Sequence, residues 1–205
     1  MLEVSNLACV RGDNQLFEGL SFALSEGEVL YVHGPNGSGK TTLLRAICGL
    51  VVPEVGEISW DGEETRKLAE DYREHISYFG HLNGLKDELT ALENLALSAS
   101  LAGVEVTEEQ ISSVLAKLGV EVCQELPTSV LSQGQKKRTA LARFIINNSK
   151  LWILDEPFTA LDVAAVAVVQ DVITHHVQQG GMVVLTTHQE VELEGVDVRH
   201  IHLKH

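Results

Sequence analysis

The sequence has few basic residues, few cysteines and no long apolar run. Only 15 residues are Lys or Arg, against 29 Asp or Glu, which gives a formal net charge of −14 at pH 7. Affinity for nucleic-acid phosphates comes from clustered Lys and Arg, so this balance argues against a nucleic-acid partner. No stretch reaches the roughly 18 consecutive apolar residues of a membrane-spanning helix, so none is predicted.

The three cysteines, Cys9, Cys48 and Cys123, are odd in number and far apart in the chain. This pattern is typical of reduced, packed thiols in a cytosolic protein, because a zinc site needs closer spacing and more ligands. The N-terminus has neither the basic flank nor the apolar segment of a secretory signal. A chain of 205 residues is long enough for one large domain, with or without a small subdomain.

Residues 34–42 form a complete phosphate-binding loop of the pattern G-x-x-x-x-G-K-[ST]. An apolar strand at 28–33 precedes it and a helix at 42–49 follows, whereas an ordinary glycine-rich turn would need no Lys-Thr pair. Lys40 is expected to reach the β- and γ-phosphates, and the Thr41 hydroxyl to ligate Mg²⁺. The residues predicted to bind the nucleotide here are Gly34, Pro35, Asn36, Gly37, Ser38, Gly39, Lys40, Thr41 and Thr42.

The residues around the loop predict an α/β fold. Further strands are expected at 2–10, about 20–32, 56–62, 76–79, 151–156, 182–187 and 197–204. The first two strands are joined by a tight turn at 11–14, so an antiparallel β layer should precede the nucleotide core. Helices are expected at 63–74, from 136 to about 148, and from 163 to about 179.

Residues 88–126 show no strand pattern. Thr90 and Glu93 form a capping box before helically spaced apolar residues, and Thr107 begins a second amphipathic helix. We interpret residues 85–130 as a helical subdomain inserted into a single domain, whose nucleotide-binding core is 1–84 and 131–205. The alternative is a pair of crossover helices packed directly on the sheet.

Two carboxylates follow the apolar strand that begins at Leu151. Ligands bind at the carboxyl ends of such buried parallel strands. Asp155 suits Mg²⁺, directly or through water, and Glu156 is placed to orient or deprotonate an attacking water. His188 stands at the end of the next apolar strand.

Taken in order, these motifs resemble those of the ATP-binding-cassette (ABC) ATPases. The motifs are the loop 34–42, Leu-Ser-x-Gly-Gln at 131–135, Asp155-Glu156, Ala160-Leu161-Asp162 and His188. The resemblance covers essentially the whole chain and implies a P-loop NTPase (RecA-like) core that uses ATP and Mg²⁺.

The same resemblance implies a head-to-tail, ATP-dependent homodimer. In such a dimer Ser132 and Gly134, with Gln135 of the same motif, face the γ-phosphate that is held by Lys40 of the other subunit. A hydroxyl, a close backbone N–H and a helix N-terminus suit that contact. His188 would contact the γ-phosphate, and Asp162 would link the two sites.

Two positions depart from the commonest ABC pattern. Arg11 replaces the aromatic residue that usually stacks on adenine; a guanidinium can stack on a purine too, and a solvated turn residue is the alternative. His81 replaces a glutamine, and its imidazole is a shorter side chain that can still contact the water or metal region. We therefore take His81 as a candidate for both catalysis and contact with the metal.

Within this family the chain looks like the ATPase subunit of the bacterial cytochrome c maturation system, on residues 6–12 with 16–17, residues 80–81 with 89–95, and residues 131–143. This implies a peripheral protein on the cytoplasmic face of the inner membrane, paired with integral membrane subunits. ATP hydrolysis there drives delivery of haem to, or its release with, a periplasmic haem chaperone, and haem is not expected to bind this chain directly. We expect residues 82–89, with Leu82, Leu85 and Leu89, and the start of the helix at Thr90 to line the docking groove, unless all three leucines pack into the helical subdomain.

Other functions stay open. The chain could serve another small ABC exporter, or act as a soluble ABC protein on ribosomes or DNA, although no heptad run separates Thr41 from Leu131. A nucleotide-regulated scaffold without turnover would need no base such as Glu156. The alternating His200, His202 and His205 could ligate haem or metal, but we favour an exposed edge strand with polar ends.

Overall fold

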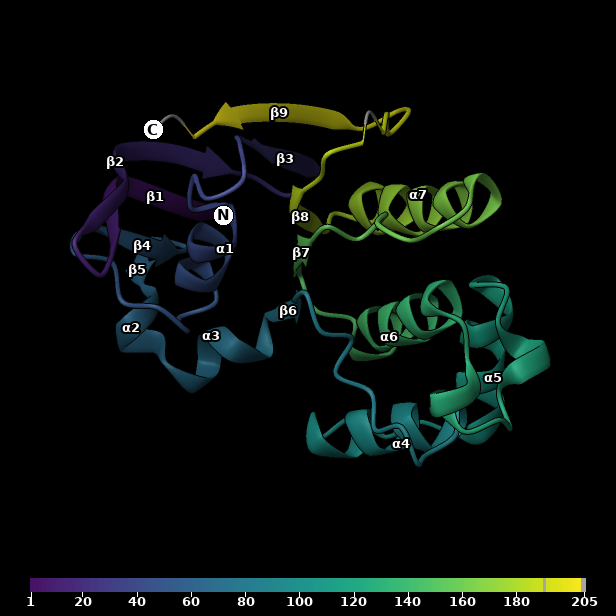
Figure 1. The fold of residues 1–205 in the computed structure, drawn as a ribbon. Coiled ribbons are helices and arrows are strands. Elements are labelled where there is room, and N and C mark those ends of the chain that lie inside the picture. Colours follow the sequence, from purple (N-terminus) through teal and green to yellow (C-terminus); the bar gives the residue numbers. More distant parts are fainter. Residues whose placement is uncertain (190, 204–205) are drawn as a thin grey trace.

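The structure, a computed structural model, describes residues 1–189 and 191–203. Two sheets organise the chain: an antiparallel sheet of order β2-β1-β4-β5 and a parallel sheet of order β6-β7-β8-β3-β9. In Figure 1 the antiparallel sheet and α1 lie on one side of the parallel sheet, and α4 to α7 lie on the other. The expected α/β class, with its antiparallel layer and helical part, is confirmed.

The antiparallel layer begins with β1 (Leu2–Arg11) and β2 (Asn14–Leu24), and β4 (Val55–Trp60) and β5 (Glu63–Glu64) complete it. The expected strand at about 20–32 is wrong, because residues 14–24 form β2 and a turn at Gly27 (φ 81°) separates them from β3 (Glu28–His33). The first residues of β2 are polar, so the sequence pattern did not predict a strand there. Such residues are tolerated there because β2 is an edge strand with much of its surface in solvent.

The nucleotide core is built on β3, β6 (Ile76–Phe79), β7 (Leu151–Asp155), β8 (Met182–Thr186) and β9 (Asp197–His202). Every residue of β7 and β8 is buried, as a central strand with both faces covered requires. The edge position of β9 is confirmed, but the prediction for His205 falls outside the described residues.

Helix α1 (Lys40–Ile47) starts two residues earlier than expected and ends before Gly49, which has φ 71°. The expected helix at 63–74 is only partly right. Its first two residues form β5, and α2 (Thr65–Leu68) and α3 (Glu70–Glu74) are interrupted at Ala69, where φ is 46°.

The helical part comprises α4 (Ala91–Leu101), α5 (Glu108–Lys117), α6 (Gln133–Asn147) and two short 3₁₀ turns, Glu121–Cys123 and Thr128–Val130. Both expected capping boxes are present, at Thr90 and Thr107. Helices α4 and α5 pack on α6 and share one apolar cluster with it, which favours a helical subdomain over crossover helices on the sheet. The exact boundaries at 85 and 130 stay a prediction.

Helix α6 starts at Gln133, not at residue 136, because Ser132 caps it: the Ser132 hydroxyl accepts from the Gln135 N–H and the Gln135 side chain accepts from the Ser132 N–H. Its opposite face contributes Leu141 and Phe144 to a second cluster with β7, β8 and α7 (Val163–Gln178). Thus α6 is shared between the helical part and the sheet.

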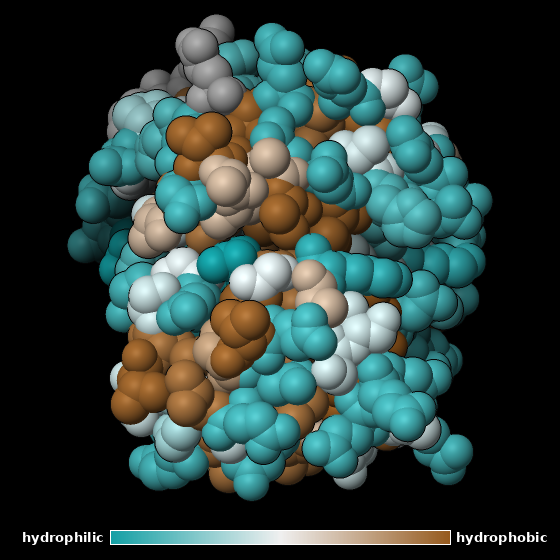
Figure 2. Space-filling model, turned by 90° about the vertical axis from the view of Figure 1, so that its right-hand side faces the viewer, coloured by the Kyte–Doolittle hydropathy of each residue, from teal (hydrophilic) through white to brown (hydrophobic). Residues whose placement is uncertain are grey.

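The three free cysteines are all buried, as packed thiols should be. Among the described residues no helix is both long and apolar enough to cross a membrane. Figure 2 shows the face over α5, α6 and α7, where hydrophobic residues gather in patches between hydrophilic ones.

His176, near the end of α7, packs against the parallel sheet. Its ring lies parallel to that of Trp152, with the centroids 3.8 Å apart and the planes 6° from parallel. Burial lowers the pKa of His176 to about 4, because desolvation disfavours the imidazolium; backbone hydrogen bonding around Met182 and Lys150 opposes the shift. The neutral ring is therefore the form that the fold accepts.

We predict that acid destabilises the chain partly through His176. In the unfolded chain this imidazole takes up its proton near pH 6.5, but in the folded chain only near pH 4, so its share of stability is intact above about 6.5 and is lost as pH falls between these values. His176→Phe keeps a stacked ring without a titrating group. Thermal unfolding at pH 7.5 and 5.0 should show a smaller drop in Tm for the variant; equal drops in both proteins would contradict this role.

Candidate active site

A cleft of about 260 Å³ lies at the carboxyl ends of the parallel strands. The structure brings loop, strand-end and turn residues together there, and among them only Leu16 was not predicted from the sequence. The lining residues are Arg11, Leu16, Asn36, Gly37, Gly39, Lys40, Thr41, Thr42, His81, Asp155, Glu156 and His188.

The phosphate-binding loop depends on two glycines for its shape. Gly39 has φ 96°, and a Cβ there would come within 2.9 Å of Leu16 and Phe17 on β2; at Gly34 (φ 152°) a Cβ would come within 2.5 Å of the Ser38 hydroxyl. Strand β2 of the antiparallel layer thus packs directly against the phosphate-binding loop, which explains why Leu16 lines the cleft.

Lys40 lies folded over its own loop. Its ammonium donates to the carbonyl oxygens of Gly34 (2.7 Å) and Pro35 (3.1 Å), and the residue is buried. These two hydrogen bonds hold the positive charge at the floor of the cleft, beside the N-terminus of α1, where an anionic phosphate is favoured.

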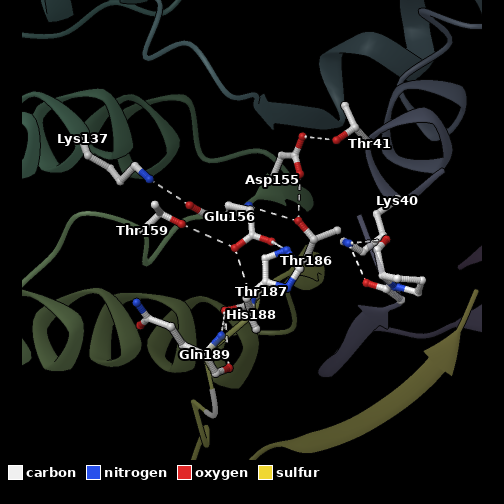
Figure 3. Close-up of polar contacts among 12 residues, drawn as sticks. Lys40, Thr41, Lys137, Asp155, Glu156, Thr159, Thr186, Thr187, His188 and Gln189 are labelled. Carbon is white, nitrogen blue, oxygen red and sulfur yellow. Dashed lines mark hydrogen bonds and ion pairs between the residues drawn. The ribbon is translucent and has the colours of Figure 1, made fainter. Parts of the chain in front are cut away.

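Asp155, the last residue of β7, is buried, and both oxygens of its carboxylate accept hydrogen bonds. One carboxylate oxygen accepts from the Thr41 hydroxyl and the other from the Thr186 hydroxyl, each at 2.8 Å (Figure 3). Thr186 is not among the site residues predicted from the sequence. The signal was a hydroxyl residue at the end of the next apolar strand, but only the observed pairing of Asp155 with Thr186 across β7 and β8 shows that they meet.

Glu156 follows in a strained conformation with φ 54°. For a residue other than glycine, this costs about 1–2 kcal/mol and needs support from its neighbours. The Glu156 N–H donates to the Thr186 carbonyl and hydroxyl oxygens (3.2 and 3.0 Å). The carboxylate accepts from the Thr159 hydroxyl (3.4 Å) and the His188 N–H (3.3 Å).

The His188 ring lies beside the Glu156 carboxylate, with Nε2 3.4 Å from Oε1 (Figure 3). The two side chains come from the ends of β7 and β8, and both line the cleft. The structure therefore places a carboxylate and an imidazole side by side in the cleft that Lys40 also lines, as the strand-end pattern suggested.

Ser132, Gly134, Gln135 and Asp162 do not line this cleft. Ser132 and Gln135 cap α6, and the Asp162 carboxylate caps α7 by accepting from the Ala165 N–H at 2.8 Å. Within one chain Ser132, Gln135 and Asp162 are therefore helix-capping residues, and Gly134 lies in the first turn of α6. Their predicted nucleotide contacts would have to reach another subunit, and remain predictions.

Arg11 and His81 are exposed side chains at the rim of the cleft. His200 and His202 share a strand face, as expected, and their rings stack on that of His33 at 5.1 and 4.8 Å between centroids. His33 Nε2 and His200 Nδ1 lie 2.8 Å apart and share a hydrogen bond. Across residues 1–189 and 191–203, no group of three or more His, Cys, Asp or Glu is arranged to hold a metal ion.

The segment after His81 is only partly packed. Leu82 is 83% exposed, while Leu85 and Leu89 are half-buried, so the alternative that all three leucines pack inside is wrong for Leu82. The Asn94 side chain holds this segment to α4 through hydrogen bonds to the backbone N–H and C=O of Lys86 (2.8 and 3.0 Å).

A larger hollow, of about 510 Å³, lies beside Phe144, Trp152 and Val172. Its walls are mainly apolar and it contains neither a glycine-rich loop nor paired carboxylates. Volume alone would select this hollow, but the chemistry of the smaller cleft identifies the candidate active site.

Comparison with known proteins agrees with this geometry. The family model described as "ABC transporter" matches residues 17–159. Among solved structures, an ATP-binding cassette captured as a dimer with ADP and Pi after hydrolysis superposes with a TM-score of 0.86 at 28% identity, covering 100% of this chain and 94% of that one. A Pyrococcus furiosus ABC transporter ATP-binding protein gives 0.85 at 29% identity, covering 98% and 96%.

Curated relatives match over nearly the full length. The "Cytochrome c biogenesis ATP-binding export protein CcmA" of Nitrosomonas europaea is 52% identical over 98% of this chain and 94% of its own. The protein of the same name in Nitrosospira multiformis is 50% identical over 98% of both chains, and that of Pseudomonas aeruginosa is 47% identical over 95% and 96%.

The fold and the cleft define a nucleotide-binding ATPase of the ABC type. More narrowly, this chain belongs to the ABC transporter family, in the group of the cytochrome c biogenesis ATP-binding export proteins.

We predict that Gly39→Ala abolishes nucleotide binding. The new methyl group would meet Leu16 and Phe17 at 2.9 Å in a backbone conformation that alanine disfavours, so the loop must shift away from β2. Gly103→Ala is the matched control, because Gly103 has a similar positive φ (70°) but open space around its Cα. Titration with a fluorescent ATP analogue should show binding in the control alone; unchanged affinity in Gly39→Ala would contradict the role of this contact.

Proposed function

We propose that this chain is the ATP-hydrolysing subunit of a membrane complex for cytochrome c biogenesis. ATP turnover there drives delivery of haem to, or its release with, a periplasmic haem chaperone. The observation that carries the proposal is the cleft that joins Lys40, Asp155 and Glu156, in a chain 52% identical to a cytochrome c biogenesis export protein. An ATPase subunit of another small ABC exporter is the second candidate, since the cleft itself does not select a cargo.

The oxygen atoms around Asp155 fit Mg²⁺. Mg²⁺ prefers a few carboxylate or hydroxyl oxygens and completes its shell with water and phosphate oxygens. The Thr41 hydroxyl and the Asp155 carboxylate, now 2.8 Å apart, offer such donors at the mouth of the loop. When bound, Mg²⁺ neutralises phosphate charge; His81, a nitrogen donor at the rim, would act through a water.

The phosphate-binding loop holds ATP through its backbone N–H groups, and Lys40 exchanges its two loop carbonyls for phosphate oxygens. Thr41, held by Asp155, fixes the orientation of the first turn of α1 toward the phosphates. Arg11 at the rim offers a planar guanidinium to the adenine ring. Each of these groups comes from an element that the sheet already positions, so binding needs little rearrangement of the backbone.

Glu156 acts as the general base for hydrolysis. Its carboxylate accepts a proton from the attacking water as the water oxygen bonds to the γ-phosphorus and the bond to the ADP oxygen breaks. Thr159 and the His188 N–H orient one oxygen of this carboxylate. The His188 ring, beside the other oxygen, is placed to donate to the γ-phosphate.

The capping residues outside the cleft complete the site in a head-to-tail dimer. Ser132, Gly134 and Gln135 stand at the exposed N-terminus of α6, which presents free N–H groups and the positive end of the helix dipole. Asp162 at the N-terminus of α7 lies beside them in the dimer interface. A relative solved as a dimer with ADP and Pi supports this arrangement.

The chain is peripheral, on the cytoplasmic face of the inner membrane, and docks to integral membrane subunits. The exposed Leu82 and the segment up to Leu89 are the proposed contact, because apolar side chains left in solvent mark binding sites. Nucleic acid is not a partner, given the net charge of −14, and haem is not bound directly.

We predict that Glu156→Gln lowers ATP turnover by about 10²-fold or more, because the amide keeps the shape of the side chain but cannot accept the proton. Binding of Mg-ATP should persist, and light scattering should then show a stable dimer. Lys40→Ala is the control, which should neither bind nor dimerise. Wild-type turnover in Glu156→Gln, or a nucleotide-independent dimer in both variants, would refute the assignment.

We predict that Leu82→Asp abolishes co-purification with integral membrane subunits and prevents maturation of cytochromes c in cells. Folding and ATP binding should be intact, because the side chain is 83% exposed. Val52→Asp, at a side chain 74% exposed between α1 and β4, is the matched control and should assemble normally. Normal cytochrome c levels in a deletion strain, with loss of another export activity, would favour the second candidate function.

A further inference from the structure

Lys137 connects the signature helix to the catalytic turn of the same chain. It lies on α6, three residues after Gly134, and its ammonium donates to the Glu156 backbone carbonyl at 2.8 Å (Figure 3). The ammonium also lies 5.7 Å from the centre of the Phe79 ring, at the end of β6. Neither the family motifs nor the lining of the cleft includes this lysine.

The Lys137 ammonium is half-buried and makes few polar contacts. Burial lowers its pKa, and the nearby carboxylates of Glu156 and Asp155 oppose that shift. The hydrogen bond to Glu156 is the one polar contact of its side chain in the part of the chain that the structure describes. A half-buried ammonium with a single carbonyl partner carries a desolvation cost that one hydrogen bond offsets only in part.

The turn that Lys137 contacts is strained at both ends, since Glu156 has φ 54° and Ala160 has φ 64°. Such conformations persist only where the surroundings over-determine them. Thr186 fixes the Glu156 N–H, Lys137 fixes its C=O, and Thr159 and His188 fix its carboxylate. Helix α6 touches the other end of the turn as well, since a Cβ on Gly134 would lie 3.3 Å from the Ala160 carbonyl.

We propose that Lys137 is a positioning residue for Glu156, through which the signature helix sets the place of the general base in its own chain. The inference rests on the proposed roles of Glu156 and of the signature motif. When the N-terminus of α6 engages the γ-phosphate in the partner's site, any rotation of α6 moves Lys137 and hence the Glu156 carbonyl. Each signature motif thereby couples the occupied site of the partner to the base of its own site.

The test is a double-mutant cycle between Lys137→Met and Glu156→Gln, measured as steady-state hydrolysis of radiolabelled ATP by the purified full chain. Lys137→Met keeps an unbranched side chain that lacks the ammonium group and is one atom shorter. We expect kcat to fall by about 10- to 100-fold, since misplacing a catalytic group by about 1 Å has that effect. The KM for ATP should stay within about twofold, because Lys137 does not line the cleft.

Since Lys137 acts through Glu156, adding Lys137→Met to Glu156→Gln should cause no further loss of kcat. Lys137→Arg, which keeps a donor and the charge, should recover most of the activity. Lys136→Met is the matched control on the same helix, because Lys136 pairs with Asp87 and not with Glu156; its kcat should equal that of the wild type. If Lys137→Met fails to unfold cooperatively on heating, Lys137→Gln takes its place under the same criteria.

The outcomes separate this inference from the proposed function. Wild-type hydrolysis by Glu156→Gln would remove the base itself and with it the proposed mechanism. Slow hydrolysis by Glu156→Gln together with a near-wild-type kcat for Lys137→Met would overturn only the role of Lys137. Additive losses in the double variant, or an arginine variant as slow as the methionine one, would also overturn it.

Discussion

The two hydrogen bonds to Asp155 are the constraint on which the active site depends. They join the first turn of α1, the end of β7 and the end of β8, three elements that are distant in the sequence. Both donors are hydroxyl groups and both acceptor oxygens are on a buried carboxylate, so neither partner can be lost without leaving a buried polar group unsatisfied. The position of the phosphate-binding loop relative to the two central strands is thereby fixed.

The strained turn at Glu156 follows directly after Asp155, whose position these hydrogen bonds fix. The chain leaves β7 at Glu156 in a left-handed conformation, and groups from β8 and α6 hold it there. A carboxylate that serves as a base has to point at a water and not into the sheet, and an extended continuation of β7 would not turn it toward the cleft. The strained backbone of Glu156 is thus the conformation that turns its carboxylate toward the cleft.

The signature residues show how one structural feature can serve folding and function together. A serine and a glutamine in a capping box are sufficient to start α6, and an aspartate is sufficient to start α7. The same caps leave two helix N-termini at the surface, and these are suited to anions. A single chain contains the caps but not their proposed ligand, so the second role requires another subunit.

The sequence by itself determined the local features of this protein. The phosphate-binding loop, the capping boxes at Thr90 and Thr107, the buried strands β7 and β8, and the strand-end carboxylates all follow from short-range patterns. These succeed because glycine conformations, helix caps and continuous burial each depend on a few consecutive residues.

Only the tertiary structure decided which distant residues meet. The β7–β8 register brings Thr186 to Asp155, the packing of β2 on the loop brings Leu16 to the cleft, and the helical phase of α6 brings Lys137 to Glu156. The start of β2 was missed because an edge strand tolerates polar residues, and α6 begins at Gln133, three residues before the helix predicted from residue 136. Pairing register and helix phase depend on contacts between segments far apart in the chain, and no short stretch of sequence contains that information.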